Sequence, residues 1–161
     1  IFEDALNTDP NKVLEDLQNS VDSGNKTQNS GKIAISADKF NQIMISKSYQ
    51  TLETTSQFIQ YGDYIKKSYM AKNDNYKIEF YELSNEDNAL DMYNTNKTKF
   101  ESQKGNSSSY LTVNKNNYNT YTLNTNGKYK YLSRIDNTFI YVDVPAEYKD
   151  EVKDLIEELG Y

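Results

Sequence analysis

The chain contains few of the residue types that carry out covalent or metal chemistry. Its 161 residues include no cysteine and no histidine. This composition excludes cysteine nucleophiles, histidine bases, Ser-His-Asp triads and nearly all zinc or transition-metal sites. The sequence also lacks the EF-hand, Walker, GxGxxG and HExxH patterns. What remains is carboxylates, lysines, many tyrosines and one arginine, so we expect neither a metal ion nor another cofactor.

The best candidates for a binding site lie between residues 118 and 144, where three short alternating segments are separated by turn residues. If Asp136 and Asn137 form a two-residue turn, one face of the resulting strands combines aromatic and cationic side chains. These predicted ligand-binding residues are Tyr121, Lys130, Arg134, Phe139 and Tyr141. Aromatic rings supply contact area and the two cations supply charge-assisted hydrogen bonds. The sequence therefore predicts a binding surface on an uncovered sheet face.

The opposite face of the same strands is richer in β-branched residues and is the predicted core surface. It carries Tyr118, Thr120, Tyr129, Tyr131, Ile135, Ile140, Val142 and Val144. This register pairs Lys130 with Asp143 and requires either two or four loop residues near Gly127. A one-residue slip or a three-residue loop would exchange the two faces. The competing interpretation of the aromatic face is the ordinary β-propensity of tyrosine on exposed strands, partly covered by long lysine side chains.

Carboxylates suggest an alternative, enzymatic function. Glu53, Glu79 and Glu82 fall on predicted strands, and a hydrolase would need two acids about 5 to 10 Å apart in one pocket. Their spacing does not favour any particular pair. The other acidic groups fit structural roles, because those at 86, 87 and 91 begin a predicted helix and those between 147 and 158 lie on the polar side of another.

Several elements must position these residues. A helix is expected after Ser36, which can act as its N-cap, and a strand at 49–55. The connection at 56–63, around Gly62, has no clear form. A hairpin follows, with strands at 64–72 and 76–83, and its predicted core face holds Ile65, Tyr69, Ala71, Tyr76, Ile78 and Phe80.

The second half of the chain completes the pattern. A helix is predicted from a capping box at Ser84 to just before Gly105, followed by a strand at 110–114, the three strands described above, and a last helix that ends before Gly160. The fold class is therefore α+β: a two-layer sandwich with a mainly antiparallel sheet of about six or seven strands and helices packed on one face. The order of elements is similar to that of TATA-binding-protein-like and helix-grip folds, and order alone does not choose between them.

The N-terminal part has a different composition. Asp9, Pro10 and the apolar spacing of Val13, Leu14, Leu17 and Val21 predict a helix, whereas residues 22–32 contain no apolar residue and predict a linker. We therefore divide the chain into an N-terminal helix and polar tether at 1–32 and an α+β domain at 33–161.

Charge and hydropathy exclude further classes. The formal net charge of -6 argues against nucleic-acid binding, which requires clustered lysine and arginine. No run of about 18 apolar residues occurs, so no membrane-spanning segment is expected. The chain starts at Ile1 and shows no signal peptide, which suggests a processed chain.

Three stretches resemble uncharacterised lipoproteins of Gram-positive Firmicutes, especially clostridia. They are KKSYMAKNDNYKIEFYELSNEDNALDMYNTNKTKFESQKG, YTLNTNGKYKYLSRIDNTFIYVDV and YKDEVKDLIEELGY, and the resemblance covers residues 36–161. It implies export and a lipid anchor on the outer face of the cell membrane, although this chain contains neither the signal peptide nor the lipid-modified cysteine. The resemblance implies no catalytic residues.

Together these observations predict a noncatalytic, surface-tethered extracellular module that binds a protein, a peptide or a cell-envelope ligand. Two alternatives remain open: an exported carboxylate-dependent hydrolase, and a structural or assembly protein of the cell envelope. A stable dimer with a large apolar patch would favour the last of these.

Overall fold

The computed structural model describes residues 31–161, of which residues 33–161 form one compact unit. The predicted N-terminal helix and nearly all of the predicted tether lie outside the described residues. The proposed division of the chain after residue 32 therefore stays a prediction.

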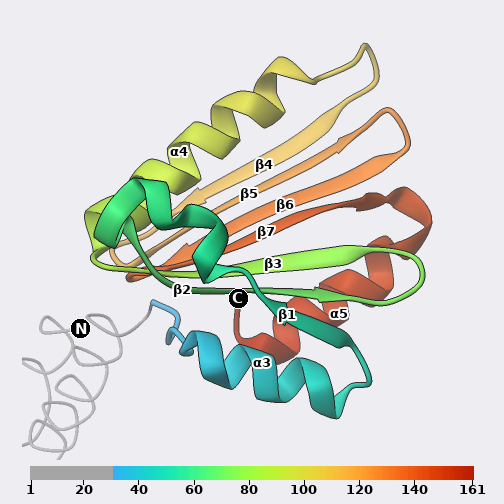
Figure 1. Ribbon diagram of the computed structural model, residues 1–161. Coiled ribbons are helices and arrows are strands. Elements are labelled where there is room, and N and C mark those ends of the chain that lie inside the picture. Colours follow the sequence, from blue (N-terminus) through green and yellow to red (C-terminus); the bar gives the residue numbers. More distant parts are fainter. Residues whose placement is uncertain (1–30) are drawn as a thin grey trace, which may run out of the picture. The chain divides into compact units, whose positions relative to one another are not determined.

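The centre of the fold is a seven-stranded sheet in which every neighbouring pair is antiparallel (Figure 1). In spatial order its strands are β1 (Gln50–Glu53), β2 (Ile65–Lys72), β3 (Lys77–Leu83), β7 (Thr138–Pro145), β6 (Lys128–Ile135), β5 (Tyr118–Thr125) and β4 (Ser109–Asn114). Two meanders, β1 to β3 and β4 to β7, thus meet where β3 pairs with β7. The predicted α+β class and the size of the sheet are confirmed.

The helical elements are α3 (Ala37–Ser46), the 3-10 segment η1 (Thr55–Tyr64), α4 (Glu86–Ser102), a single turn η2 (Ala146–Tyr148) and α5 (Lys149–Leu159). Ser36 caps α3 as predicted, because its hydroxyl oxygen accepts the Lys39 N–H at 3.1 Å. α5 ends at Gly160, whose φ of 85° lies in the left-handed region that glycine adopts without strain.

The start of α4 differs from the prediction by one residue. Its N-cap is Asn85 rather than Ser84, since the Asn85 side-chain oxygen accepts the Asn88 N–H at 2.8 Å. The Ser84 hydroxyl instead donates to the backbone carbonyl of Asp63 at the end of η1. This alternative partner explains why the apparent capping box was misleading.

The strand registers follow the predicted alternation. Lys130 lies opposite Asp143 in the β6–β7 pair, and the β5–β6 turn consists of two residues, Asn126 and Gly127, both with positive φ. The β2–β3 hairpin also has the predicted register except at its start. There a β-bulge follows Ile65, and this side chain joins the opposite face from the one predicted.

Helices cover both faces of the sheet, whereas the sequence predicted them on one. The α3/α5 face packs strand residues of β2, β3, β6 and β7 against α3 and α5. The α4 face packs against α4, with η1 beside it; its buried cluster is Ile65, Tyr81, Leu83, Ala89, Tyr93, Phe100, Tyr121, Leu123, Leu132 and Phe139. Figure 1 shows α4 on the side away from α3 and α5. The position of α4 determines where a ligand can reach the sheet.

Candidate ligand-binding site

Most of the predicted binding surface is covered. Tyr121, Lys130, Arg134 and Phe139 are 0%, 6%, 5% and 1% exposed, and Tyr141 alone is partly exposed. The expectation that these residues form an open sheet face is therefore wrong for four of the five. Their register and their common face are as predicted, so the error concerns what lies on top of them.

The cover is α4, and its own sequence explains why it lies there. Ala89, Tyr93 and Phe100 occupy one side of this helix and are all buried. An apolar stripe of this kind must pack against another apolar surface. The aromatic residues of β5 to β7 supply that surface; for example, the Phe100 ring centroid lies 5.3 Å from that of Tyr141. The face predicted to bind a ligand thus packs mainly against α4.

The two cations of the predicted surface have partners inside the fold. The Lys130 ammonium donates to Asp143 Oδ2 at 2.8 Å and to Gln103 Oε1 at 2.6 Å. The Arg134 Nε donates to Asn119 Oδ1 at 2.7 Å, and its Nη1 donates to a carbonyl in the adjoining turn at 3.0 Å. Both groups are buried but hydrogen-bonded, as buried charges must be. Neither is available to a ligand without rearrangement.

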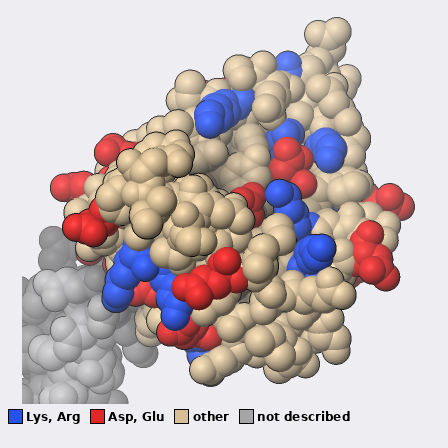
Figure 2. Space-filling view, in the orientation of Figure 1, with Lys and Arg blue, Asp and Glu red and all other residues tan. Residues whose placement is uncertain are grey.

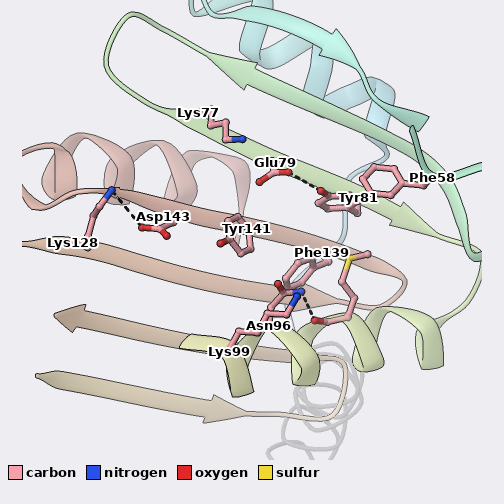
Figure 3. A pocket seen from close by; sticks show the side chains of 11 residues that line it. Phe58, Lys77, Glu79, Tyr81, Asn96, Lys99, Lys128, Phe139, Tyr141 and Asp143 are labelled. Atoms are coloured by element: carbon pink, nitrogen blue, oxygen red, sulfur yellow. Dashed lines mark hydrogen bonds and ion pairs between the residues drawn. The ribbon is translucent and has the colours of Figure 1, made fainter. Parts of the chain in front are cut away.

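α4 leaves part of this face uncovered, and a groove lies between α4 and η1. It consists of two adjoining hollows of about 450 Å³ and about 390 Å³ that share Phe58, Met92 and Asn96. The larger hollow reaches β3, β6 and β7; its charged residues are Lys77, Glu79, Lys99, Lys128 and Asp143 (Figure 3). Among residues 31–161, no charged residue lines the smaller hollow, and its further lining is Tyr61, Tyr64, Ile65 and Thr95. We call these the charged hollow and the apolar hollow.

Two hydrogen bonds connect the walls of the groove, η1 and α4, beside the apolar hollow. The Tyr64 hydroxyl, at the end of η1, donates to the Asn88 carbonyl in α4 at 2.8 Å, and the Asn88 amide donates back to the Tyr64 carbonyl at 3.4 Å. Gly62 bends η1 with φ 62° and ψ -132°, a backbone conformation that residues other than glycine rarely adopt. These contacts fix the position of the η1 aromatic residues relative to α4.

The floor of the groove is a set of packed aromatic rings. The Phe58 ring meets Tyr81 edge-on at 5.6 Å between centroids, and Tyr81 lies 6.1 Å from Phe139. The Tyr81 hydroxyl donates to Glu79 Oε1 at 2.8 Å, so both polar groups have a partner. Burial, followed by the charge of Glu79, raises the pKa of Tyr81 well above its usual range. Tyr81 is therefore a neutral donor at physiological pH.

The charged hollow has more basic than acidic groups. Among the described residues, neither Lys77 nor Lys99 forms an ion pair, and Lys128 Nζ is 3.9 Å from the nearest Asp143 oxygen. Asp143 is engaged more closely by Lys130. Figure 2 shows basic and acidic side chains gathered beside the hollow between η1 and α4. A local positive excess in a chain of net charge -6 favours an anionic ligand group here.

The sequence prediction found Tyr141 but missed most of the groove. Phe58 lies in the connection whose form was left open, and Met92, Asn96 and Lys99 lie along one edge of the buried side of α4. A usable signal was nevertheless present at Phe58, because aromatic residues are unexpected in a connection exposed to water. Lys77, Glu79 and Tyr81 alternate with the predicted core residues of the hairpin and therefore share its other face, which joins the face that holds Tyr141.

Comparison with known proteins identifies no relative: the chain matches no protein-family model, no curated protein and no solved structure. Within residues 31–161 no helix is long and apolar enough to cross a membrane. No cluster of acidic side chains in that range could hold a metal ion. The class of the protein is therefore described by its fold and its groove: it is an α+β domain with an amphipathic surface groove.

Proposed function

We propose that the protein is a noncatalytic binding module that takes its ligand in the groove between η1 and α4. The observation that carries this proposal is the meeting of exposed aromatic surface, in one groove, with Lys77 and Lys99, which form no ion pair within residues 31–161. Ligand sites commonly combine an apolar lining with a few polar groups that fix orientation. Extracellular display on a lipid-anchored tether follows from the resemblance to clostridial lipoproteins and from the polar residues 22–32.

The contacts of the acidic groups favour binding over catalysis. Asp143 is held by Lys130 at 2.8 Å, and Glu79 accepts a hydrogen bond from Tyr81 at 2.8 Å. Each carboxylate thus has a partner within the wall of the groove. A nucleophile or general base must instead be aimed at the reacting atoms of its substrate.

One observation favours a second candidate, the carboxylate-dependent hydrolase. Glu79 and Asp143 line the same hollow, and Glu79 is paired with Tyr141, two residues from Asp143. Diagonal neighbours of this kind on adjacent strands lie about 7 to 8 Å apart. Carboxyl groups carried on such positions can reach the separation of about 5 to 9.5 Å that paired-carboxylate hydrolysis uses.

The two functions respond differently to Glu79→Gln and Asp143→Asn. A binding module should retain ligand affinity within about threefold in both variants, because each amide can still accept a hydrogen bond. A hydrolase would lose turnover by orders of magnitude. Mass spectrometry of cell-wall polysaccharide and peptide digests detects turnover, and carboxylate-dependent cleavage would replace the binding proposal.

The binding proposal itself is tested by filling the groove. Asn96→Trp should block the groove, whereas Asn94→Trp places the same ring on an exposed position of the same helix outside the groove. Backbone amide shifts in NMR titrations with peptides and cell-wall fragments should change around Phe58 and Met92 in the native protein and in Asn94→Trp, and not in Asn96→Trp. Binding that is unaffected by Asn96→Trp would exclude the groove.

A further inference from the structure

The two hollows differ in a way that specifies the ligand. The apolar hollow lies between the rings of Phe58 and Tyr64 and the side chain of Met92, so it suits an aliphatic or aromatic group. Thioether and aromatic side chains adapt to apolar groups of varied shape. A ligand that uses both hollows must therefore carry an apolar group next to an anionic one.

The lysines specify the anionic group. Lys77 comes from β3, Lys99 from α4 and Lys128 from β6, and all three border the charged hollow (Figure 3). Because they border one hollow from three elements, a carboxylate bound there is attracted by all three charges and can accept a charge-assisted hydrogen bond from one of them. The two carboxylates already present leave most of this charge uncompensated. Glu79 accepts a hydrogen bond from Tyr81, and Asp143 is held by Lys130 at 2.8 Å and lies farther from Lys128, at 3.9 Å.

The exposure of the groove favours a peptide over a lipid. Tyr61 on the η1 wall is 60% exposed, so an acyl chain along this wall would remain largely in water. A peptide tolerates such a site, because its backbone amides keep hydrogen bonds to solvent while single side chains enter the hollows. Asn96, where the hollows meet, keeps its side-chain carbonyl as an acceptor while its amide donates to the Met92 carbonyl at 2.8 Å.

We infer that the groove binds an acidic peptide segment, with an apolar side chain between Phe58 and Met92 and a nearby carboxylate among Lys77, Lys99 and Lys128. This inference rests on the proposed binding function and adds the chemical class of the ligand. The partner is thus an extended, acidic region of another protein, or a peptide released from one.

The experiment uses the full chain and a random display library of peptides of about 12 residues. Selected peptides should combine aspartate or glutamate with a large apolar residue a few positions away. Lys99→Glu should weaken the binding of a synthetic selected peptide roughly tenfold, as should raising NaCl from about 50 to about 500 mM. Lys153→Glu, the same charge change on an exposed position of α5, should alter affinity less than about twofold.

Two further probes separate this inference from the function on which it rests. These probes are peptidoglycan fragments and phosphatidylglycerol vesicles, each tested with native protein and with Asn96→Trp. If only one of these binds, and Asn96→Trp abolishes that binding, the groove is a binding site but its ligand is not a peptide. Selected peptides without acidic residues, or with affinity unchanged by Lys99→Glu, would also overturn the inference. If no probe binds in a manner sensitive to Asn96→Trp, both proposals are wrong.

Discussion

The two faces of the sheet differ in how completely they are packed. The α3/α5 face is closed, with rings such as Phe40 and Phe80 stacked at 4.8 Å and both completely buried. The α4 face buries two cations, Lys130 and Arg134, and remains open along the groove. Burying charge beside an open groove does not maximise stability. The difference indicates that one face supplies most of the folding free energy and the other presents a shaped surface.

The hydroxyl groups of buried tyrosines show the same contrast. On the α3/α5 face, the Tyr161 hydroxyl shares a hydrogen bond with Thr138 at 2.5 Å and accepts the Ile35 N–H at 3.3 Å. On the α4 face, the hydroxyls of Tyr93 and Tyr121 are buried and have no hydrogen-bond partner among the described residues. Unsatisfied buried groups lower stability. The comparison of faces can therefore be tested one side chain at a time.

The largest expected effect is the loss of a ring from the closed face. Phe80→Ala should lower the free energy of unfolding by about 3 to 5 kcal/mol, because it removes a fully buried ring and leaves a cavity. Phe58→Ala, in the partly exposed groove wall, should cost about 1 kcal/mol. Urea unfolding followed by circular dichroism measures both. Equal losses would show that the groove wall is as important for stability as the closed face.

A smaller effect is expected from the buried cation of the α4 face. Lys130→Met should cost about 1 to 3 kcal/mol, since Asp143 loses its closest partner but retains some contact with water. Adding Asp143→Asn should recover part of the loss, because the remaining group is then uncharged. The double variant is compared with both single variants in the same urea titration. A loss equal to the sum of the single losses would mean that the pair is not coupled.

A matched pair of hydroxyl deletions gives the next smaller effect. Tyr161→Phe removes a hydrogen-bonded hydroxyl and should cost about 1 kcal/mol. Tyr121→Phe removes a buried hydroxyl without a partner and should leave stability unchanged within about 0.5 kcal/mol, or raise it slightly. Thermal unfolding of the two variants tests this difference. A clear loss in Tyr121→Phe would indicate that its hydroxyl is satisfied, for example by a buried water molecule.

The sequence was sufficient for the sheet because the relevant signals are local. Alternation with a period of two residues, together with two-residue turns at Asn126–Gly127 and Asp136–Asn137, set the register that pairs Lys130 with Asp143. The same alternation separated the two faces of β5 to β7 correctly. These patterns depend on neighbouring residues and not on what packs above them.

The candidate site could not be predicted in the same way, because it depends on the placement of a helix. The stripe Ala89, Tyr93 and Phe100 shows that α4 buries one side, but it fits either face of the sheet. Once α4 occupies the aromatic face, Tyr121 becomes core and the accessible surface moves to the space beside η1. That wall includes Phe58, in a segment without helical or strand periodicity. Long-range packing therefore decided which predicted residues a ligand can reach.

The smallest effect concerns Tyr141, the predicted site residue that remains in the groove. Burial, then the charges of Asp143 and Glu79, raises its pKa from 10.0 to about 12. An unfolded chain ionises this phenol near pH 10, while the folded protein still holds the proton. Its stabilising contribution is therefore present below pH 10 and is lost as the pH rises towards 12.

Tyr141→Phe removes this group and should make the alkaline fall in stability less steep. The change should be modest, because Tyr141 is partly exposed and the buried phenols of Tyr93 and Tyr121 still titrate in both proteins. Urea midpoints at about pH 9 and about pH 11 measure the slope. Parallel pH profiles would mean that Tyr141 ionises in the groove as it does in water. The charged hollow would then be more accessible to water than the partial burial of Tyr141 indicates. The difference in solvation between the two faces of the sheet would accordingly be larger than burial alone indicates.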